Sequence, residues 1–243
     1  MASSPPKRID VCLSPALIDL YPLHDRTVVV IDILRATSCM TTALAHGVAG
    51  IIPVAELEAC RDLRGDGYCT AGERNGEKVD GFDLGNSPFE YMNPDLKGKR
   101  IAFTTTNGTL AISKSLNAAE IVVGSFLNLY AVVGYLKSGT RNILAVCAGW
   151  KGKVNLEDTL FAGALVDELA GAAEPECDAP LMAMHLYRQA KNDLSGFLRN
   201  SSHVKRLRRL NIEKDIEFCL EVGRYDVVPV VRDGMIVSHT SSA

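Results

Sequence analysis

The stretch VVVIDILRATS, residues 28–38, decides the fold that we expect for this chain. Its first seven residues are apolar except for Asp32, and such a run predicts a strand buried on both faces. The residues that follow are small or polar and lead into a helical stretch to about His46, with Thr37 or Ser38 as its expected cap. A buried strand that passes directly into a helix is half of a βαβ unit, which predicts a parallel sheet covered by helices.

Two later stretches repeat this pattern, RIAFTTTNGT at residues 100–109 and NILAVCAGWKG at residues 142–152. Each is an apolar run that ends in a cluster of small or polar residues. Other predicted elements are strands at residues 9–13, 50–55 and 120–124 and a helix at residues 155–170. The alternation predicts an α/β fold with a largely parallel or mixed sheet and helices on both faces, layered α/β/α.

The two ends of the chain depart from this alternation. Residues 1–8 are rich in Ser and Pro, so we expect them to be disordered, and the last three residues to be frayed. We expect residues 9–175 to form the α/β core that carries the ligand site. Residues 176–240 are expected to form a C-terminal α+β subdomain, with a helix at 178–200 and a hairpin at 227–237 that turns at Arg232-Asp233-Gly234.

Composition places the chain among globular proteins and excludes some functions. The net charge of -3 disfavours nucleic-acid binding, which usually shows a basic excess. The seven cysteines form no CxxC pair, which favours reduced thiols in the cytoplasm. No apolar run reaches the roughly 18 residues that span a membrane. The oligomeric state stays open, with a homodimer through the apolar C-terminal region as the arrangement considered.

The ends of the three similar strands predict a site for a small anion. Ligands of open α/β sheets bind at the carboxyl ends of the strands, where helix N-termini favour negative charge. Turn and cap chemistry alone is the alternative for any one cluster. Three matching clusters in one sheet favour the site, and its candidate residues are Asp32, Arg35, Thr37 and Ser38 after the first strand, Thr104, Thr105, Thr106, Asn107 and Gly108 after the second, and Cys147, Ala148, Gly149 and Lys151 after the third.

Charged residues suggest what the site does. Asp32 ends an apolar strand, so it needs an ion partner such as Arg35, unless it is a metal ligand or a nucleophile. Residues 72–91 read as a long polar loop, which is uncommon in a compact domain unless it is functional. The candidates in this loop are a second carboxylate, Glu73, an anion clamp, Arg74, and the polar pair Asn86 and Ser87.

A second acidic group lies in the first turn of the predicted helix at residues 155–170. Glu157 and Asp158 either complement the helix dipole or, together with Asp32, hold a cation. Cys147 is expected to be a buried, inert thiol, since a thiol phosphatase places arginine where Lys153 stands. The basic segment around His203, residues 203–209, is expected to be a solvated helix face or to supply a substrate-facing Lys or Arg.

The sequence resembles the 2-phosphosulfolactate phosphatase family, the ComB-like proteins of coenzyme M biosynthesis. The resemblance rests on ordered blocks between about residues 9 and 238: VVVIDILRATS, GERNG, LGNSPFEY, TTTNGT, CAGWKG with Glu157-Asp158, and Asp215 followed by VVPVV. It implies a Mg²⁺-dependent phosphatase with an α/β fold and a site in a cleft. The implied reaction hydrolyses the phosphate ester of (2R)-2-phospho-3-sulfolactate to sulfolactate and phosphate. The candidate residues above match the family blocks position by position.

The mechanism expected from these residues is metal-assisted. Asp32 and either Glu157 or Asp158 would hold Mg²⁺, and Arg35, Arg74 and the amides after Thr106 would neutralise the phosphoryl oxygens. The attacking group is water or Asp32 itself. A sulfonate needs its own basic contact, from Arg74, Lys151 or the segment 205–209. Two alternatives remain: a phosphatase of another small hydroxyacid or sugar phosphate, and a non-catalytic anion-binding protein.

Overall fold

The strand predicted from residues 28–34 is β2 (Arg26–Ile31), and every residue in it is buried. The structure is a computed structural model, and it describes residues 6–239. β2 pairs with one parallel strand on each side, and further strands of this parallel block follow on one of these sides. The members of this first block are, in order, β7 (Glu120–Gly124), β2, β8 (Asn142–Cys147), β1 (Arg8–Cys12) and β9 (Glu174–Pro175).

A second parallel block completes the sheet, and the C-terminal hairpin joins the two. This block runs β4 (Cys69–Arg74), β6 (Arg100–Thr104) and β3 (Gly50–Pro53), with the short β5 (Glu77–Lys78) at its edge. The predicted hairpin is confirmed as β10 (Pro229–Arg232) and β11 (Met235–Ser238), which pair antiparallel to each other and to β7 and β3. The sheet is therefore mixed, as predicted, and it is open. Its central strands, β11 and β10, come from the C-terminal end of the chain and lie between β3 and β7.

Helices cover both faces, so the predicted α/β/α layering is also confirmed. Successive residues of a strand point to opposite faces, and in β2 Val29 and Ile31 pack on one side while Val28 and Val30 pack on the other. The first side is covered by α4 (Leu129–Ser138), α5 (Leu156–Glu168) and α6 (Asp178–Ala190). The second side is covered by α1 (Ala36–Ala45) and α3 (Gly108–Lys114).

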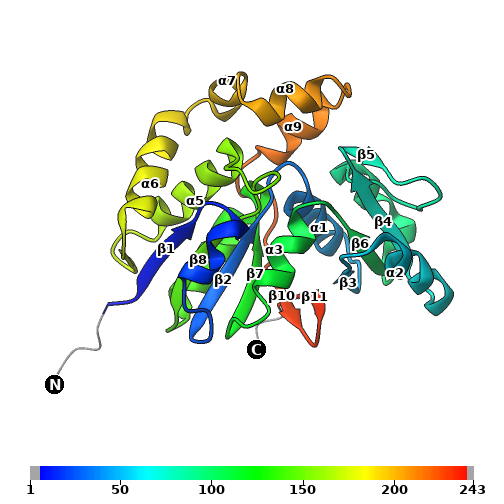
Figure 1. Cartoon of the computed structure of the whole chain (residues 1–243), viewed down its shortest axis with the longest axis horizontal. Helices are drawn as coiled ribbons and strands as arrows, with labels where there is room; N and C mark the ends of the chain where they lie inside the picture. The colour runs from blue at the N-terminus through cyan, green and yellow to red at the C-terminus, as the bar shows by residue number, and fades with distance from the viewer. Residues whose placement is uncertain (1–5, 240–243) are drawn as a thin grey trace.

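Three short helices cross the sheet edge where the parallel strands end. They are α7 (Leu194–Leu198), α8 (Ser202–Arg208) and α9 (Glu213–Cys219), along the top of Figure 1. The remaining short helices are α2 (Leu57–Asp62), η1 (Pro15–Leu20), η2 (Leu63–Asp66), η3 (Pro88–Met92), η4 (Pro94–Leu96) and η5 (Phe126–Asn128). Among the described residues, no helix has the length and apolar character needed to cross a membrane.

Several local predictions were wrong in detail. The single helix predicted at 178–200 is two helices, α6 and α7, because the chain turns at residues 191–193 and Asp193 caps α7. The predicted loop at 72–91 is largely ordered. It contains the end of β4, then β5 and η3, with Asn75 and Gly76 at positive φ in the turn. That Asn-Gly pair is the usual signal of a tight hairpin.

The caps and the chain ends also differ from expectation. Arg35 is the N-cap residue of α1, and neither Thr37 nor Ser38 caps the helix. Instead the Thr37 hydroxyl donates to the Asp32 carbonyl at 2.9 Å, and the Ser38 hydroxyl donates to the Ile33 carbonyl at 2.8 Å. Of the segment predicted to be disordered, Arg8 begins β1. Residues 1–5 lie outside the described part of the chain, as do the last three residues.

Candidate active site

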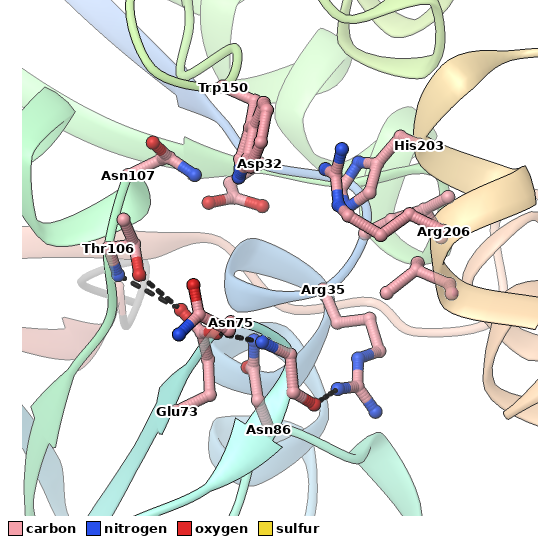
Figure 2. Close-up of a pocket in the computed structure, with 13 residues that line it drawn as sticks. Asp32, Arg35, Glu73, Asn75, Asn86, Thr106, Asn107, Trp150, His203 and Arg206 are labelled. Atoms are coloured by element: carbon pink, nitrogen blue, oxygen red, sulfur yellow. Dashed lines mark hydrogen bonds between the residues drawn. The ribbon is translucent and has the colours of Figure 1, made fainter. Parts of the chain in front are cut away.

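A pocket lies at the carboxyl edge of the sheet, between the strand ends and α8 (Figure 2). Segments from the whole length of the chain meet in it: the turns after β2, β4, β6 and β8, the loop at Asn86, and helix α8. Its lining residues are Asp32, Leu34, Arg35, Glu73, Asn75, Gly76, Asn86, Thr106, Asn107, Trp150, His203, Arg206 and Leu207. Both parallel blocks of the sheet thus contribute to one site.

Asp32 is the acidic group at the centre of this pocket. It is 9% exposed, and burial raises the pKa of its carboxyl to about 7, with His203 opposing the rise and Glu73 adding to it. No lysine or arginine among the described residues forms an ion pair with it. Gly108 makes room beside it, because a Cβ there would lie 2.9 Å from Asp32 Oδ2. Asp32 is therefore a carboxylate whose charge the surrounding protein leaves largely uncompensated.

Glu73 ties the β4–β5 turn to the start of α3. Its Oε1 accepts hydrogen bonds from the backbone amide and the hydroxyl of Thr106, both at 3.0 Å. Its Oε2 accepts from the Gly76 amide at 2.7 Å. These donors hold the carboxylate in place at the pocket wall (Figure 2). Glu73 therefore brings a second acidic group to the pocket that also contains Asp32.

Arg35 lines the pocket, but a buried carboxylate neutralises it. It forms an ion pair with Asp215 of α9, and both side chains are less than one-tenth exposed. Asp215 Oδ1 also accepts from the Ser87 hydroxyl at 3.0 Å, and Arg35 donates to the Gly76 carbonyl at 2.9 Å. Arg35 thus joins α9, the β4–β5 turn and the loop at Ser87, and little of its charge remains for a ligand.

The two acids at the start of α5 have different environments. Asp158 accepts backbone hydrogen bonds from Ile33 at 2.9 Å and from Gly149 at 3.0 Å, so it fixes two strand ends to each other. Burial, with Glu157 and Asp32 nearby, raises the pKa of Asp158 well above its usual value. Glu157 is fully buried and its Oε1 pairs with His203 Nδ1. Neither acid lines the pocket directly.

Arg206 of α8 brings a positive charge to the pocket. Its guanidinium carbon lies 3.9 Å from the centre of the Trp150 ring, a close cation–π contact. The Nη2 atom is buried and has no hydrogen-bond partner among the described residues. Burial lowers the pKa of Arg206, opposed by Glu157 and Glu73, but a guanidinium group stays charged. Arg206 is thus a partly buried cation that lines the pocket and has one guanidinium nitrogen without a partner among the described residues.

Of the other predicted site residues, some line the pocket and others do not. Asn86 and Asn107 line the pocket, and Asn86 Oδ1 is a buried oxygen without a hydrogen-bond partner in the described chain. Ser87 borders an adjoining cavity that shares Arg35 with this pocket. Arg74 points elsewhere and donates to Thr104 Oγ1 at 3.1 Å. The residues that are buried behind the pocket are Thr37, Ser38, Thr105, Gly108, Cys147, Ala148 and Gly149.

Seven lining residues were not among the predicted catalytic, phosphate-binding or metal residues: Leu34, Asn75, Gly76, Trp150, His203, Arg206 and Leu207. Of these, Arg206 lies in the segment 205–209 that was predicted as a possible sulfonate contact. Asn75 and Trp150 stand inside the GERNG and CAGWKG blocks, so their position beside other candidates was a usable signal. His203 and Arg206 lie three residues apart on a helix, which puts both on one face. Only the packing of α8 over the strand ends shows that this face meets the pocket.

The donors of the pocket suit a divalent cation that prefers oxygen. Asp32, Glu73 and the spare Asn86 Oδ1 are hard oxygen ligands, the kind that Mg²⁺ and Ca²⁺ select. No group of three or more His, Cys, Asp or Glu side chains able to share one ion occurs in the part of the chain that the structure describes. A cation of this kind is usually held by one or two carboxylates, and water and substrate oxygens complete its coordination.

Fold and site together define an α/β protein whose pocket is lined by carboxylates and a guanidinium group, groups that enzymes of phosphoryl transfer also use. Comparison with known families agrees. The family model described as 2-phosphosulpholactate phosphatase matches residues 12–234, and the chain belongs to this family, as the sequence blocks predicted.

Similar proteins cover nearly the whole chain. A Thermotoga petrophila protein is 44% identical over 229 residues, which are 94% of this chain and 97% of that protein. A Caldanaerobacter subterraneus protein is 42% identical over 219 residues, 88% of this chain and 91% of its own length. A Clostridium tetani protein is 35% identical over 232 residues, 94% and 99% of the two chains. Each carries the name probable 2-phosphosulfolactate phosphatase.

The raised pKa of Asp32 predicts a pH-dependent stability in the metal-free protein. The folded state keeps a proton on Asp32 up to pH of about 7, whereas the unfolded carboxyl, with a pKa of 3.8, loses it earlier. Stability is therefore lost as pH rises through this window. In EDTA, Asp32→Asn should be more stable than wild type at pH 8, by on the order of a few kcal/mol, and similar to it near pH 4.

Thermal unfolding of both proteins across this pH range measures the difference. Asp80→Asn, at an exposed carboxyl, is the matched control and should show no such gain at pH 8. A gap between Asp32→Asn and wild type that stays constant with pH would contradict the environment described for Asp32.

The Arg35–Asp215 pair predicts a large loss of stability when one partner is removed. Asp215→Asn leaves the Arg35 charge buried without its carboxylate, which should lower the free energy of unfolding by about 3 kcal/mol or more. Ser87→Ala removes only one hydrogen bond to the same carboxylate and should cost about 1–3 kcal/mol. Urea unfolding measures both. Equal losses, or a loss below about 1 kcal/mol for Asp215→Asn, would show that the pair is not structural.

Proposed function

We propose that this chain is a Mg²⁺-dependent phosphoric monoester hydrolase that converts 2-phosphosulfolactate to sulfolactate and phosphate. Its family membership and the names of its relatives support the reaction and the substrate. The observation that carries the mechanism is Asp32, a buried carboxylate that has no ion partner among the described residues, in a pocket that also contains Glu73 and Arg206. The Asp32 carboxylate could bind a metal ion and the Arg206 guanidinium could bind an anionic group, so the pocket suits a metal ion together with a phosphate ester.

We assign Mg²⁺ to Asp32, with Glu73 and Asn86 Oδ1, which belong to the same pocket, as further oxygen donors. When bound, the ion would supply positive charge to a phosphoryl oxygen and polarise phosphorus. This assignment replaces Glu157 and Asp158, since neither of them lines the pocket, whereas Asp32 and Glu73 do. The second acidic ligand that we propose is therefore Glu73, which lines the pocket, and not the pair Glu157 and Asp158.

The chain's own residues would hold and orient the phosphate ester. The Asn75 and Asn107 side-chain amides line the side of the pocket opposite α8 and would bind phosphoryl oxygens (Figure 2). Leu34 and Leu207 line it with apolar surface and limit the entry of water. Such fixed donors in a partly desolvated pocket stabilise charge that develops in the transition state. Either a water molecule or Asp32 would attack phosphorus.

Among the basic candidates for the sulfonate, Arg206 has the best position. Arg74 donates to Thr104 and backbone carbonyls, and Lys151 is exposed with its Nζ 4.6 Å from the Trp150 ring centre. Arg206 lines the pocket, and its Nη2 atom has no hydrogen-bond partner among the described residues. A planar guanidinium matches the oxygen pair of a sulfonate. We therefore assign the sulfonate of the substrate to Arg206.

Two further proposals concern the protein in the cell. The cysteines form no disulfide among the described residues, which supports a reducing compartment such as the cytoplasm. We also retain the homodimer as a proposal, which light scattering on the purified protein would test against the chain mass of 26.2 kDa.

The reaction itself is tested by phosphate release from 2-phosphosulfolactate. We expect turnover with Mg²⁺ and loss of turnover in excess EDTA. Asp32→Asn should lower kcat/KM by about 100-fold or more, because the ligand that places positive charge at phosphorus is lost. Asp80→Asn should leave the rate unchanged. Turnover of a different hydroxyacid or sugar phosphate in preference would support that alternative, and anion binding without turnover would support the non-catalytic one.

Substrate recognition is tested at Arg206. Arg206→Gln should raise KM for 2-phosphosulfolactate by about 10–100-fold, the cost of a lost charge-assisted hydrogen bond. It should change KM for 2-phospholactate, which lacks the sulfonate, much less. Arg208→Gln alters an exposed arginine of the same helix and is the matched control. An equal effect on both substrates would place Arg206 on the phosphate instead.

A further inference from the structure

His203 is a pocket residue that the proposed reaction does not yet use. It comes from α8, is 8% exposed, and lies on the same side of the pocket as Arg206 (Figure 2). The Ser201 hydroxyl caps α8 by accepting from the Val204 amide at 3.2 Å, which fixes the first turn that carries His203. Its imidazole is the one such ring among the lining residues.

One nitrogen of the His203 ring is occupied, and the other is not. Nδ1 pairs with Oε1 of Glu157, and the Asn155 side-chain amide lies 3.2 Å from the same nitrogen. Both partners stand at the start of α5, so this segment fixes the orientation of the ring. The described residues provide no hydrogen bond for Nε2. His203 therefore lines the pocket with Nε2 available for a further hydrogen bond.

Glu157 is placed to make that nitrogen a proton donor. It is 0% exposed, and its second oxygen, Oε2, has no hydrogen-bond partner among the described residues. A buried carboxylate on Nδ1 fixes the tautomer with Nδ1–H and stabilises the positively charged ring, as in the hydrolytic triads. This arrangement would be costly as a purely structural contact, since a fully buried carboxylate is retained with only one of its oxygens satisfied.

The chemistry of a phosphate ester of a secondary alcohol needs such a donor. The oxygen that leaves phosphorus would otherwise depart as an alkoxide, a poor leaving group. Of the other charged lining residues, Asp32 and Glu73 are assigned to the cation, and the guanidinium groups of Arg35 and Arg206 do not release protons. His203 is thus the residue suited to protonate the leaving oxygen.

We propose that His203 is the general acid of the reaction and that Glu157 is its positioning residue; this rests on the proposed phosphatase function. The bond between phosphorus and the ester oxygen breaks, and that oxygen takes the proton from His203 Nε2 to leave as the alcohol. With water as the attacker, its oxygen bonds to phosphorus and the product is dihydrogen phosphate. The neutral imidazole then regains a proton from that product or from solvent, so charge and atoms balance.

The dependence on the leaving group tests this role. His203→Gln should lower kcat on 2-phosphosulfolactate by about 100–1,000-fold, the usual contribution of a general acid. On acetyl phosphate and p-nitrophenyl phosphate, whose leaving groups depart without a proton, the same variant should lose less than about 10-fold. Glu157→Gln should show the same selectivity with a smaller loss, because the ring remains but its charge is less stabilised. His185→Gln, at an exposed histidine of α6, should change none of these rates.

Other outcomes would overturn the proposal. Equal losses on all three substrates for His203→Gln and His203→Asn, in variants whose unfolding temperature matches wild type, would mean that His203 only supports the pocket. Unchanged rates on 2-phosphosulfolactate would mean that it has no role. If wild type does not hydrolyse 2-phosphosulfolactate, the proposed substrate fails separately. The comparison is then made with the best alkyl phosphate of a substrate panel, and the general acid is judged on that ester.

Discussion

The structure depends on how three buried carboxylates are accommodated at one edge of a sheet. Glu73, Asp32 and Glu157 come from different segments and lie near enough that Glu73 and Glu157 both raise the pKa of Asp32. Burying acidic groups together is costly unless each finds a partner. Glu73 receives backbone amides and a hydroxyl, and Glu157 receives an imidazole. Asp32 has no ion partner of its own among the described residues, and its pKa stays raised although His203 and the Ala36 backbone lower it. We propose that this imbalance makes the pocket a place for a cation.

The fold brings these groups together from two separate blocks of parallel strands. Asp32 follows β2 in one block, while Glu73 ends β4 and Thr106 follows β6 in the other. The hairpin β10–β11 joins the blocks through the middle of the sheet, and α7, α8 and α9 cross above their carboxyl ends (Figure 1). The C-terminal quarter of the chain therefore supplies the hairpin that joins the two blocks of the sheet. It also supplies helix α8, which lines one side of the pocket. It contributes Asp215 and His203, which are the ion partners of Arg35 and Glu157, and it also contributes Arg206 to the pocket.

The sequence predicted the parts of this arrangement that local patterns encode. The apolar run ending at Asp32 predicted its strand, and the small polar clusters placed Thr106 and Asn107 at the strand ends where the pocket lies. The sequence could not predict which polar side chains hydrogen-bond within the protein and which line the pocket. Thr37 and Ser38 look like ligand residues, yet their hydroxyls donate to nearby carbonyls. For the segment of His203 and Arg206 the sequence left a solvated helix face and a substrate-facing Lys or Arg both open, and the position of α8 over the strand ends puts these two residues at the pocket.

The central claim is that the uncompensated Asp32 carboxylate holds the divalent cation of the site. Titration of the metal-free protein with Mn²⁺, followed by the loss of the free-ion electron paramagnetic resonance signal, measures this binding without relying on turnover. We predict that one ion binds per chain, that Mg²⁺ displaces it, and that Asp32→Asn weakens this binding by at least about 10-fold, whereas Glu157→Gln leaves it nearly unchanged. Undiminished Mn²⁺ binding by Asp32→Asn, or its loss in Glu157→Gln alone, would contradict the account.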